Sequence, residues 1–282
     1  MKQIGLDIGT SSLKLVLLEE NGTYFTWQKT HHGKLLAAVT AALEELKKHG
    51  DTFSMAVTGS NAHIITDHLP LEPMSEIPAI VEGARSLCPE AGSVIEIGSQ
   101  NSRFITDIQK RVPRFAANEH CAGGTGSFFE DQMSRLGMTI EEYSAQVEKA
   151  QSVPRLSGRC SVFAKTDIIH RQQEGVSTPD ILLGLCYAMI RNYKAVIVRD
   201  LPIEKPVVFC GGVTKNSGVE RAIKDIFKLE DEELLIPDSA PFIAAIGAAK
   251  NAAYEISAQE LYTLLLRAEL KKEQRTSLDG WS

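Results

Sequence analysis

Residues 6–14 of the chain read Leu6-Asp7-Ile8-Gly9-Thr10-Ser11-Ser12-Leu13-Lys14, and this stretch decides the fold. Apolar residues from Gln3 to Gly9 are interrupted only by Asp7 and predict a β-strand, and Leu13 to Leu18 predicts a second one. The polar residues between them then form the bend of a β-hairpin. Backbone N–H groups in such a bend can converge on phosphate oxygens, and a carboxylate beside it can hold Mg²⁺. An ordinary polar turn has the same composition, so this hairpin alone leaves both interpretations open.

The same pattern returns near residue 96. Ser93 to Gly98 predicts a strand that is interrupted by one acid, Glu96. The polar bend Ser99-Gln100-Asn101-Ser102 follows, and Arg103 to Asp107 predicts the returning strand. Because strand, acid, glycine and polar bend occur twice in this order, we predict two duplicated lobes.

A third signal lies near residue 211. Pro206 to Cys210 predicts a strand that runs into Gly211 and Gly212, and a helix start follows after a short turn. Glycines there let an adenine and its ribose lie against the backbone. The order of phosphate hairpin, second hairpin and double-glycine adenosine turn resembles the actin, Hsp70 and sugar-kinase superfamily. The resemblance implies an α/β, actin-like ATPase fold (ribonuclease H-like), with two lobes that each carry a mixed five-stranded sheet and helices, and with the nucleotide in the interlobe cleft.

We expect the first lobe to span residues 1–90 and the second lobe, with the cysteine motifs and the adenosine turn, to span residues 91–239. Helices over about residues 240–272 would pack back on the first lobe. Apolar residues at helical spacing predict helices over Lys34–Lys48, Ser127–Leu136, Pro179–Val198, Ala240–Tyr254 and Gln259–Lys272.

Two cysteines precede predicted helix starts: Cys121, in the run Cys-Ala-Gly-Gly-Thr-Gly, and Cys160, in the run Cys-Ser-Val-Phe-Ala-Lys-Thr-Asp. A helix N-terminus stabilises a thiolate and so favours metal ligation, although position alone favours two incidental thiols, because free cysteine is commonly a small core residue. Both runs resemble the cysteine motifs of the activators ("CoA enzyme activases") of 2-hydroxyacyl-CoA dehydratases. The resemblance extends from Met1 to about Ala253.

This resemblance implies an ATPase coupled to electron transfer, with ATP/ADP, Mg²⁺ and one 4Fe-4S cluster per homodimer as cofactors. Cys121 and Cys160 of both subunits would hold the cluster, since such a cluster usually takes four thiolates. The activator would pass one low-potential electron to a 2-hydroxyacyl-CoA dehydratase-like iron–sulfur protein or a related CoA-ester reductase. A ferredoxin or flavodoxin would be the donor.

The resemblance also implies roles for single residues. Asp7 would organise Mg²⁺, directly or through water, and would act in catalysis with Glu96 and Gln100. Activators generally carry Asp-Ile-Gly-Gly-Gln-Asp where this chain has Glu96-Ile97-Gly98-Ser99-Gln100-Asn101, so hydrolysis and metal geometry are the expectations this departure affects most. The nucleotide would contact Gly9, Thr10, Ser11, Ser12, Lys14, Gly98, Ser99, Thr125, Gly211, Gly212, Val213 and Asn216.

The charge of the chain argues against nucleic acid and membranes as partners. Lysine and arginine total 30 against 36 acidic residues, a net charge of −6, with neither a basic stripe for nucleic acid nor a polybasic tail for a membrane. We expect no membrane span, because no apolar run reaches about 20 residues, and a cytoplasmic location, because Met1 leads straight into a strand instead of a signal peptide. We interpret the cysteines outside the motifs (Cys88, Cys186, Cys210) as structural and His31-His32 as a solvated turn.

Two alternatives stay open. A small-molecule kinase of the same fold, of sugar or pantothenate type, would need a carboxylate base, for which Glu96 and Asp131 are the candidates, and it would leave the cysteine motifs unexplained. A non-catalytic nucleotide-sensing module would bind ATP without hydrolysis because of the departures at Glu96 and Asn101. The chain would be a stand-alone protein or one module of a larger one.

Overall fold

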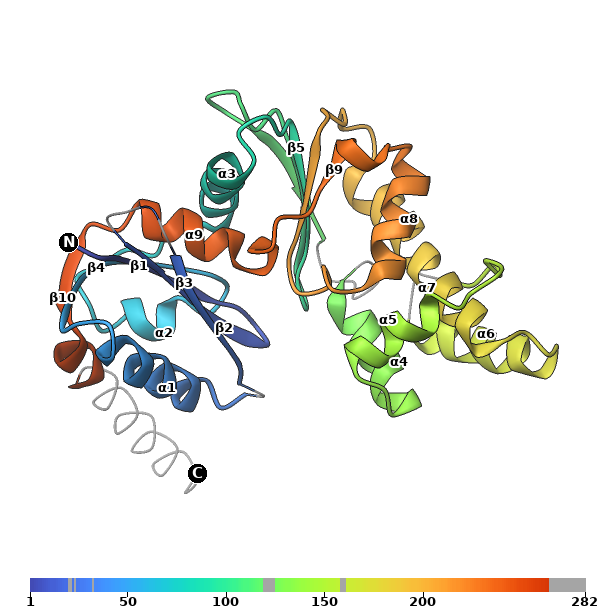
Figure 1. Cartoon of the computed structure of the whole chain (residues 1–282), viewed down its shortest axis with the longest axis horizontal. Coiled ribbons are helices and arrows are strands. Elements are labelled where there is room, and N and C mark those ends of the chain that lie inside the picture. The colour runs from blue at the N-terminus through green and yellow to red at the C-terminus, as the bar shows by residue number, and fades with distance from the viewer. Residues whose placement is uncertain (20–21, 23, 32, 119–124, 158–160, 264–282) are drawn as a thin grey trace, which may run out of the picture. The chain divides into compact units, whose positions relative to one another are not determined.

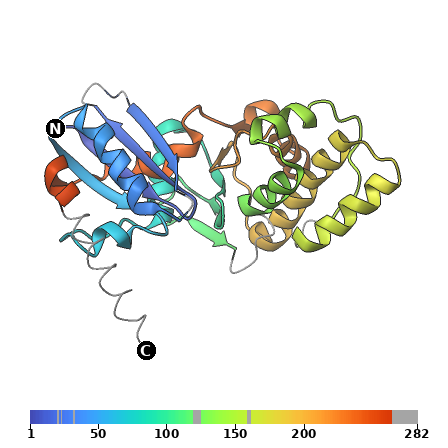
Figure 2. The same ribbon diagram turned by 90° about the horizontal axis from the view of Figure 1, so that it is seen from below.

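The computed structural model describes residues 1–19, 22, 24–31, 33–118, 125–157 and 161–263 of the chain. These residues form two compact units (Figures 1 and 2). Unit 1 comprises Met1–Ser86 and Phe242–Ser282, and unit 2 comprises Leu87–Pro241. Each unit contains a mixed sheet of five strands with helices, which confirms the predicted fold class.

The sheet of unit 1 has the strand order β10-β4-β1-β2-β3. Its first three strands form an antiparallel meander, β4 runs parallel to β1, and β10 closes the other edge antiparallel to β4. The strands are β1 (Gln3–Ile8), β2 (Ser12–Leu18), β3 (Tyr24–Thr30), β4 (Thr52–Thr58) and β10 (Tyr254–Ser257). The hairpin between β1 and β2 is the one that the opening stretch of sequence predicts.

Helices cover both faces of this sheet. Successive residues of β1 point to opposite faces, so each face contributes side chains to the contact with its helices. Ile4, Leu6 and Ile8 are buried in one core with α1 and α2. Gly5 faces the other side, where a Cβ would lie 2.0 Å from the carbonyl oxygen of Ala245 in α9. Figure 1 shows α3 and α9 on that face and α1 and α2 on the opposite one. The helices are α1 (Leu35–Lys47), α2 (His63–Thr66), α3 (Glu76–Leu87) and α9 (Ile243–Lys250).

The sheet of unit 2 has the order β7-β6-β5-β8-β9. Strand β6 pairs antiparallel with both β5 and β7, and β8 runs parallel to both β5 and β9. The strands are β5 (Ser93–Ile97), β6 (Ser102–Thr106), β7 (Arg114–Ala117), β8 (Val207–Cys210) and β9 (Leu234–Leu235). Four of the five positions therefore repeat unit 1, with β5, β6, β7 and β8 in the places of β1, β2, β3 and β4.

The core of unit 2 lies between this sheet and its helices. Ile95, Phe104 and Phe209 of the sheet are buried in one cluster with residues of α7 and α8. Helices α4 and α6 also pack against each other. The helices are α4 (Gly126–Leu136), α5 (Ile140–Val147), α6 (Ser161–Gln173), α7 (Thr178–Tyr193) with a π-helical extension (Lys194–Val198), and α8 (Ser217–Phe227), and short 3₁₀ turns occupy Asp231–Glu233 and Ala240–Phe242.

The segment from Ala240 to Tyr254 corrects the sequence analysis, which expects one helix there. The helical part ends at Lys250, and Tyr254 begins the edge strand β10. The physical reason is pairing: Tyr254 and Ile256 lie opposite Met55 and Phe53 of β4, and Ile256 is buried in the core of unit 1. A backbone that completes a sheet gains hydrogen bonds that an isolated last turn of helix lacks.

One helix of unit 2 is unusually apolar. Among the described residues Thr178–Val198 is long and apolar enough, by length and composition alone, to cross a membrane. Within unit 2, however, 72% of its apolar window is buried, and the side chains of Leu182, Leu185 and Met189 are fully enclosed by the core. Packing inside the unit therefore accounts for its apolar character.

Candidate functional site

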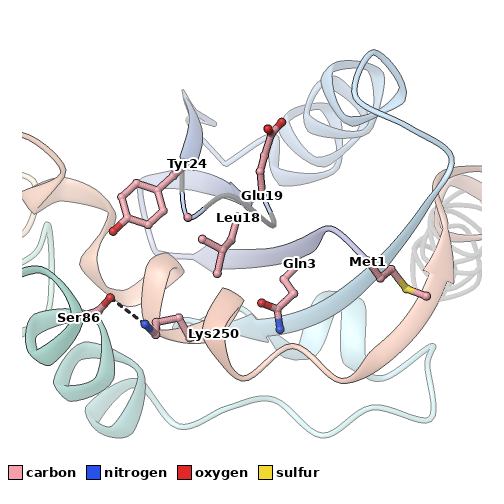
Figure 3. A pocket seen from close by; sticks show the side chains of 8 residues that line it. Met1, Gln3, Leu18, Glu19, Tyr24, Ser86 and Lys250 are labelled. Atoms are coloured by element: carbon pink, nitrogen blue, oxygen red, sulfur yellow. Dashed lines mark hydrogen bonds between the residues drawn. The ribbon is translucent and has the colours of Figure 1, made fainter.

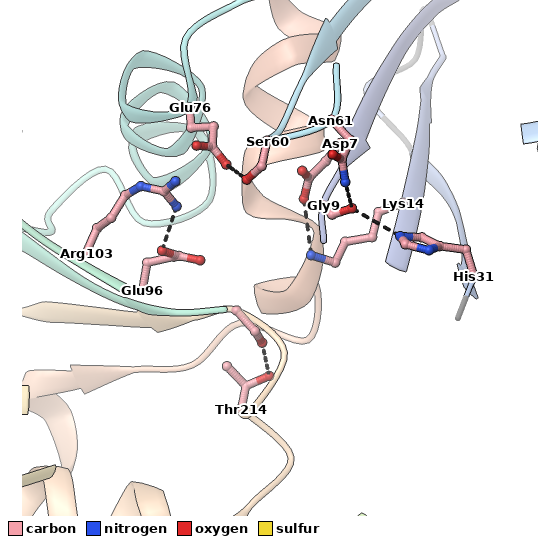
Figure 4. Close-up of polar contacts among 11 residues, drawn as sticks. Asp7, Gly9, Lys14, His31, Ser60, Asn61, Glu76, Glu96, Arg103 and Thr214 are labelled. Carbon is pink, nitrogen blue, oxygen red and sulfur yellow. Dashed lines mark hydrogen bonds and ion pairs between the residues drawn. The ribbon is translucent and has the colours of Figure 1, made fainter. Parts of the chain in front are cut away.

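The β1–β2 hairpin of unit 1 places an acid opposite a base. Asp7 and Lys14 are register partners, and Lys14 Nζ lies 3.1 Å from Asp7 Oδ2 (Figure 4). Both side chains are largely buried, with 11% and 13% of their surface exposed. The pair holds the Asp7 carboxylate at the base of the bend formed by Gly9, Thr10, Ser11 and Ser12, where the Gly9 N–H donates to the Ser12 carbonyl at 3.0 Å. The structure thus brings together the residues predicted as the phosphate hairpin.

Two residues that the sequence analysis missed contact the Gly9 carbonyl of this bend. Asn61 donates from Nδ2 to the Gly9 carbonyl at 2.9 Å, and His31 Nε2 lies 3.2 Å from the same oxygen (Figure 4). His31 is only 7% exposed, so its interpretation as part of a solvated turn is wrong. The reason is that the pairing of β3 with β2 continues past Thr30: the His31 N–H donates to the Ser11 carbonyl at 3.0 Å.

Gly59 and Ser60, which follow β4, complete the surroundings of Asp7. Gly59 has a φ of +100°, and a Cβ there would lie 2.6 Å from both Asp7 Oδ1 and the Ile8 backbone. Only glycine therefore fits. Ser60 Oγ donates to the Glu76 carboxylate at the start of α3, at 3.2 Å (Figure 4). Glu76 is thus a second carboxylate linked to this loop. Nothing in the sequence connects Thr58-Gly59-Ser60 with residue 76.

The β5–β6 hairpin of unit 2 repeats the arrangement. Glu96 and Arg103 are register partners, and Arg103 Nη1 lies 3.0 Å from Glu96 Oε2, with 12% and 10% of the side chains exposed. Figure 4 draws this pair as well. Tyr193 of α7 supports it by donating to the Arg103 carbonyl at 2.7 Å. Burial raises the pKa of Tyr193 far above its usual value, and Glu96 adds to the shift, so the phenol stays a neutral donor.

The start of α4 packs directly onto this second bend. The N–H groups of Gly126 and Ser127 donate to the carbonyls of Gly98 and Ser99 at 2.8 and 2.7 Å. A Cβ on Gly126 would lie 3.0 Å from the Gly98 carbonyl oxygen, so small residues permit this approach. Ser99 Oγ donates to the Glu130 carboxylate at 3.2 Å. The helix that follows the first cysteine motif is therefore anchored to the bend.

Gln100 lies at the exposed tip of the bend. Its carbonyl accepts from Asn118 Nδ2 at 2.9 Å, and Asn118 Oδ1 accepts from the Ser102 N–H at 2.7 Å. Asn118, just past β7, therefore fixes the backbone of the bend while the Gln100 side chain faces outward. The sequence offers no signal for this role of Asn118.

The double-glycine turn also meets the second hairpin. Gly211 has a φ of +102°, and a Cβ there would lie 2.2 Å from the Ile97 carbonyl oxygen. Gly212 is exposed, with open space where a Cβ would be, whereas Val213 is buried and lies near Gly126. Thr214 Oγ1 donates to the Gly211 carbonyl at 3.1 Å (Figure 4). In unit 2 the backbone of Gly211 thus packs closely against that of Ile97, just as Gly59 packs against Ile8 in unit 1.

Two of the expected nucleotide contacts, Thr125 and Asn216, are fully buried. Asn216 is the N-cap of α8: its Oδ1 accepts from the N–H groups of Gly218 and Val219 at 3.0 and 3.3 Å. Thr125 precedes α4, and its Oγ1 lies 2.9 Å from Ser127 Oγ. Asn216 therefore binds the backbone of the turn that it begins, whereas the Thr125 hydroxyl contacts the Ser127 side chain.

Cys186 lies beside the Asn216 cap, inside the core of unit 2. Its thiol is within 3.6 Å of Asn216 Oδ1, and burial raises its pKa to about 12, so it remains protonated. Cys88 and Cys210 are buried too. These three cysteines have the surroundings of structural residues.

Both hairpins lie within a stretch of the chain that matches a known protein family. A model of the BadF/BadG/BcrA/BcrD ATPase family matches residues 4–252. The chain belongs to this family. An activator of lactoyl-CoA dehydratase from Anaerotignum propionicum is 29% identical over 88% of this chain and 96% of its own length.

Solved structures share the fold. Component A of the (R)-2-hydroxyglutaryl-CoA dehydratase of Acidaminococcus fermentans superposes with a TM-score of 0.78 at 23% identity, covering 89% of this chain and 97% of its own. An activator of 2-hydroxyisocaproyl-CoA dehydratase from Clostridium difficile with bound ADPNP gives 0.77 at 22% identity, covering 97% and 98%. The BadF/BadG/BcrA/BcrD family member described here therefore has the actin-like ATPase fold.

The donor set of this family member fits one of the expected metals. Asp7 offers a single carboxylate, which suits Mg²⁺ that takes its other ligands from water and phosphate. In the described part of the chain no three His, Cys, Asp or Glu side chains cluster as a metal site. Cys121 and Cys160, the expected cluster ligands, lie outside the described residues.

A surface hollow of about 330 Å³ lies elsewhere in unit 1 (Figure 3). Gln3 at the start of β1 and Leu18 at the end of β2 line it, at the end of the hairpin opposite the bend. Lys250 donates to Ser86 Oγ beside it, at 3.0 Å. None of the residues predicted for the site lines this hollow.

Proposed function

We propose that this chain is an ATP-dependent activator that delivers one low-potential electron to a 2-hydroxyacyl-CoA dehydratase-like iron–sulfur protein or a related CoA-ester reductase. The observation that carries the proposal is the pair of hairpins with Asp7–Lys14 and Glu96–Arg103, in a member of an ATPase family. The names of the similar proteins, one of them with bound ADPNP, supply the class of acceptor.

In this proposal the phosphates of ATP contact residues 9–12 and the adenosine contacts residues 211–213. Asp7 holds Mg²⁺, directly or through water, and Lys14 holds the Asp7 carboxylate in place beside the bend. Backbone donors and the metal then neutralise the charge that develops as water attacks the γ-phosphate, a reaction that depends mainly on positioning and electrostatics.

The second acid has a more limited role. Glu96 forms an ion pair with Arg103, so the guanidinium balances its negative charge. The other carboxylate oxygen, Oε1, lies near Gly98. We propose that Glu96 orders the bend and the water network there, and that the exposed Gln100 side chain contacts the attacking water. The missing second carboxylate at Asn101 then makes hydrolysis slow but does not abolish it.

For the cluster we propose that Cys121 and Cys160 of two subunits supply four thiolates. Two observations support this: the cysteines precede α4 and α6, and these two helices pack against each other in unit 2. When bound, the 4Fe-4S group would supply the electron for the acceptor, with a ferredoxin or flavodoxin as its source. The α4 anchor on Gly98 and Ser99 links this region to the second bend.

The kinase alternative finds less support in the side chains. Glu96 is engaged by Arg103, and Asp131 is exposed on α4, so neither is a free base held at a bend. The nucleotide-sensing alternative differs from the proposal only in lacking hydrolysis and electron transfer, and experiment separates them.

The test uses anaerobically purified protein, reduced with dithionite and mixed with Mg-ATP and resting lactoyl-CoA dehydratase. We expect dehydration of the CoA ester only when both the reduced protein and ATP are present, with ADP and free phosphate as products. Transfer of the γ-phosphate to a sugar or to pantothenate would support the kinase instead. Binding of ATP without any hydrolysis would support the sensing module.

A further inference from the structure

Four carbonyl oxygens in and beside the bend of unit 1 accept hydrogen bonds from the protein. Asn61 donates to two of them, from its backbone N–H to Ile8 at 2.9 Å and from its Nδ2 to Gly9 at 2.9 Å. The Ser12 carbonyl accepts from the Gly9 N–H, and the Ser11 carbonyl from the His31 N–H, both at 3.0 Å. A phosphate-binding bend requires this arrangement, because carbonyl oxygens repel phosphate oxygens.

The contacts of His31 indicate the hydrogen-bond role of each ring nitrogen. A carbonyl can only accept, so His31 Nε2, at 3.2 Å, carries the proton. The Gly33 N–H donates to His31 Nδ1, at 3.2 Å, so that nitrogen carries the lone pair. Both ring nitrogens therefore have hydrogen-bond partners, which hold the ring between Gly33, after β3, and the bend.

Holding this carbonyl also aims the next amide. The Gly9–Thr10 peptide is trans, so the Gly9 C=O and the Thr10 N–H point in opposite directions. With the carbonyl drawn toward His31 and Asn61, the Thr10 N–H points away from them. Among the described residues it has no hydrogen-bond partner.

We propose that His31 is a positioning residue for the phosphates of the bound nucleotide. Together with Asn61 it fixes the Gly9–Thr10 peptide so that the Thr10 N–H donates to a phosphate oxygen. Without the imidazole the peptide can rotate and turn a carbonyl toward the anion. This inference rests on the proposed nucleotide function, and it adds a residue that lies outside both hairpins' motifs.

Substitutions of His31 test the inference by calorimetric titration with Mg-ATP and with AMP. His31→Gln keeps an N–H donor near the position of Nε2, whereas His31→Asn reaches only the position of Nδ1 and His31→Leu keeps neither. His63→Leu, an exposed histidine of α2 in the same unit, is the matched control. Circular dichroism and thermal melting report whether each variant is folded.

We expect His31→Leu and His31→Asn to weaken Mg-ATP binding by about tenfold, the effect of one hydrogen bond to a charged group. The affinity for AMP should change much less, because AMP lacks the distal phosphates. His31→Gln should keep most of the wild-type affinity for Mg-ATP. Equal loss for ATP and AMP, no loss in either variant, or failure of glutamine to restore binding overturns the inference. If His31→Leu does not fold, the comparison of Gln with Asn decides. Wild-type protein that does not bind Mg-ATP at all refutes the proposed function itself.

Discussion

Arg103 faces Glu96 across β5 and β6 at 3.0 Å, in the register position that Lys14 takes opposite Asp7 across β1 and β2. The two acid–base pairs show that duplication reached the side chains as well as the strand order. In each unit a glycine with positive φ, Gly59 or Gly211, then closes over the isoleucine that follows the acid.

The first prediction concerns Asp7. Asp7→Asn removes the carboxylate charge without changing its shape, so Mg²⁺-dependent ATP hydrolysis should fall by roughly 100-fold. Steady-state hydrolysis at a series of Mg²⁺ concentrations measures this. Asp67→Asn, at an exposed position after α2, is the control and should leave the rate unchanged. An Asp7→Asn enzyme with wild-type Mg²⁺ dependence would show that Asp7 does not organise the metal.

The second prediction concerns the Glu96–Arg103 pair. Arg103→Met removes the cation that pairs with the largely buried Glu96 carboxylate, so the free energy of unfolding should drop by about 3 kcal/mol. Adding Glu96→Gln should recover part of this loss, because the carboxylate charge is then gone. Urea unfolding of both single variants and the double variant forms the cycle. Additive losses would mean that the two side chains do not interact.

Gly211 provides the third prediction. At Gly211 the backbone φ is positive, and the Cβ of an alanine would also collide with the Ile97 carbonyl oxygen. Gly137, at the end of α4, has a φ of +64° too, but a Cβ there would meet only open space. We expect Gly137→Ala to cost about 1 kcal/mol of stability and Gly211→Ala clearly more. Denaturant unfolding compares them, and similar costs at both positions would contradict the close contact.

The fourth prediction concerns Asn216. Because its side chain is fully buried and caps α8, Asn216→Ala should lower stability by about 1 kcal/mol and weaken AMP binding through the altered turn. Asn216→Ser, which keeps a capping oxygen, should retain both. Thr139→Ala removes the cap of α5 instead and should reduce stability alone. If serine fails to rescue AMP binding while restoring stability, Asn216 contacts the nucleotide directly.

A fifth prediction concerns acid stability. The backbone N–H of Ser152, the Ser177 hydroxyl and the N–H of Gln151 lower the pKa of Asp180, in the first turn of α7. A carboxyl group with a lowered pKa in the folded state adds stability above its unfolded pKa of about 3.9, and this is lost as the pH falls through the folded value. Asp180→Asn should therefore lose less stability than wild type between neutral pH and about pH 3. Parallel curves would exclude this role for Asp180.

The sequence predicted both hairpins correctly, because Asp7 and Glu96 interrupt apolar strands that end in glycine and hydroxyl residues. It also placed the helices after the double glycine and most of α7. Short edge strands escaped prediction: Arg114–Ala117 has little apolar alternation, and Tyr254–Ser257 is defined by its pairing with β4.

The supporting residues of the site were beyond the reach of sequence patterns. His31 and Asn61 approach Gly9 only because β3 and β4 flank β2 and β1 in the sheet, and Glu76 reaches Ser60 only through the placement of α3. The sequence analysis does not identify Asn216 as the cap of α8, and its contact with the nucleotide stays a prediction.

The central claim is that thiolates from two chains share one iron–sulfur centre, and iron and sulfide analysis of the anaerobically purified protein, together with its mass in solution, tests it most directly. The account predicts a brown dimer with about four iron and four sulfide ions per two chains, and a colourless protein after Cys121→Ser or Cys160→Ser. A colourless monomer that binds Mg-ATP under strict anaerobiosis would contradict it.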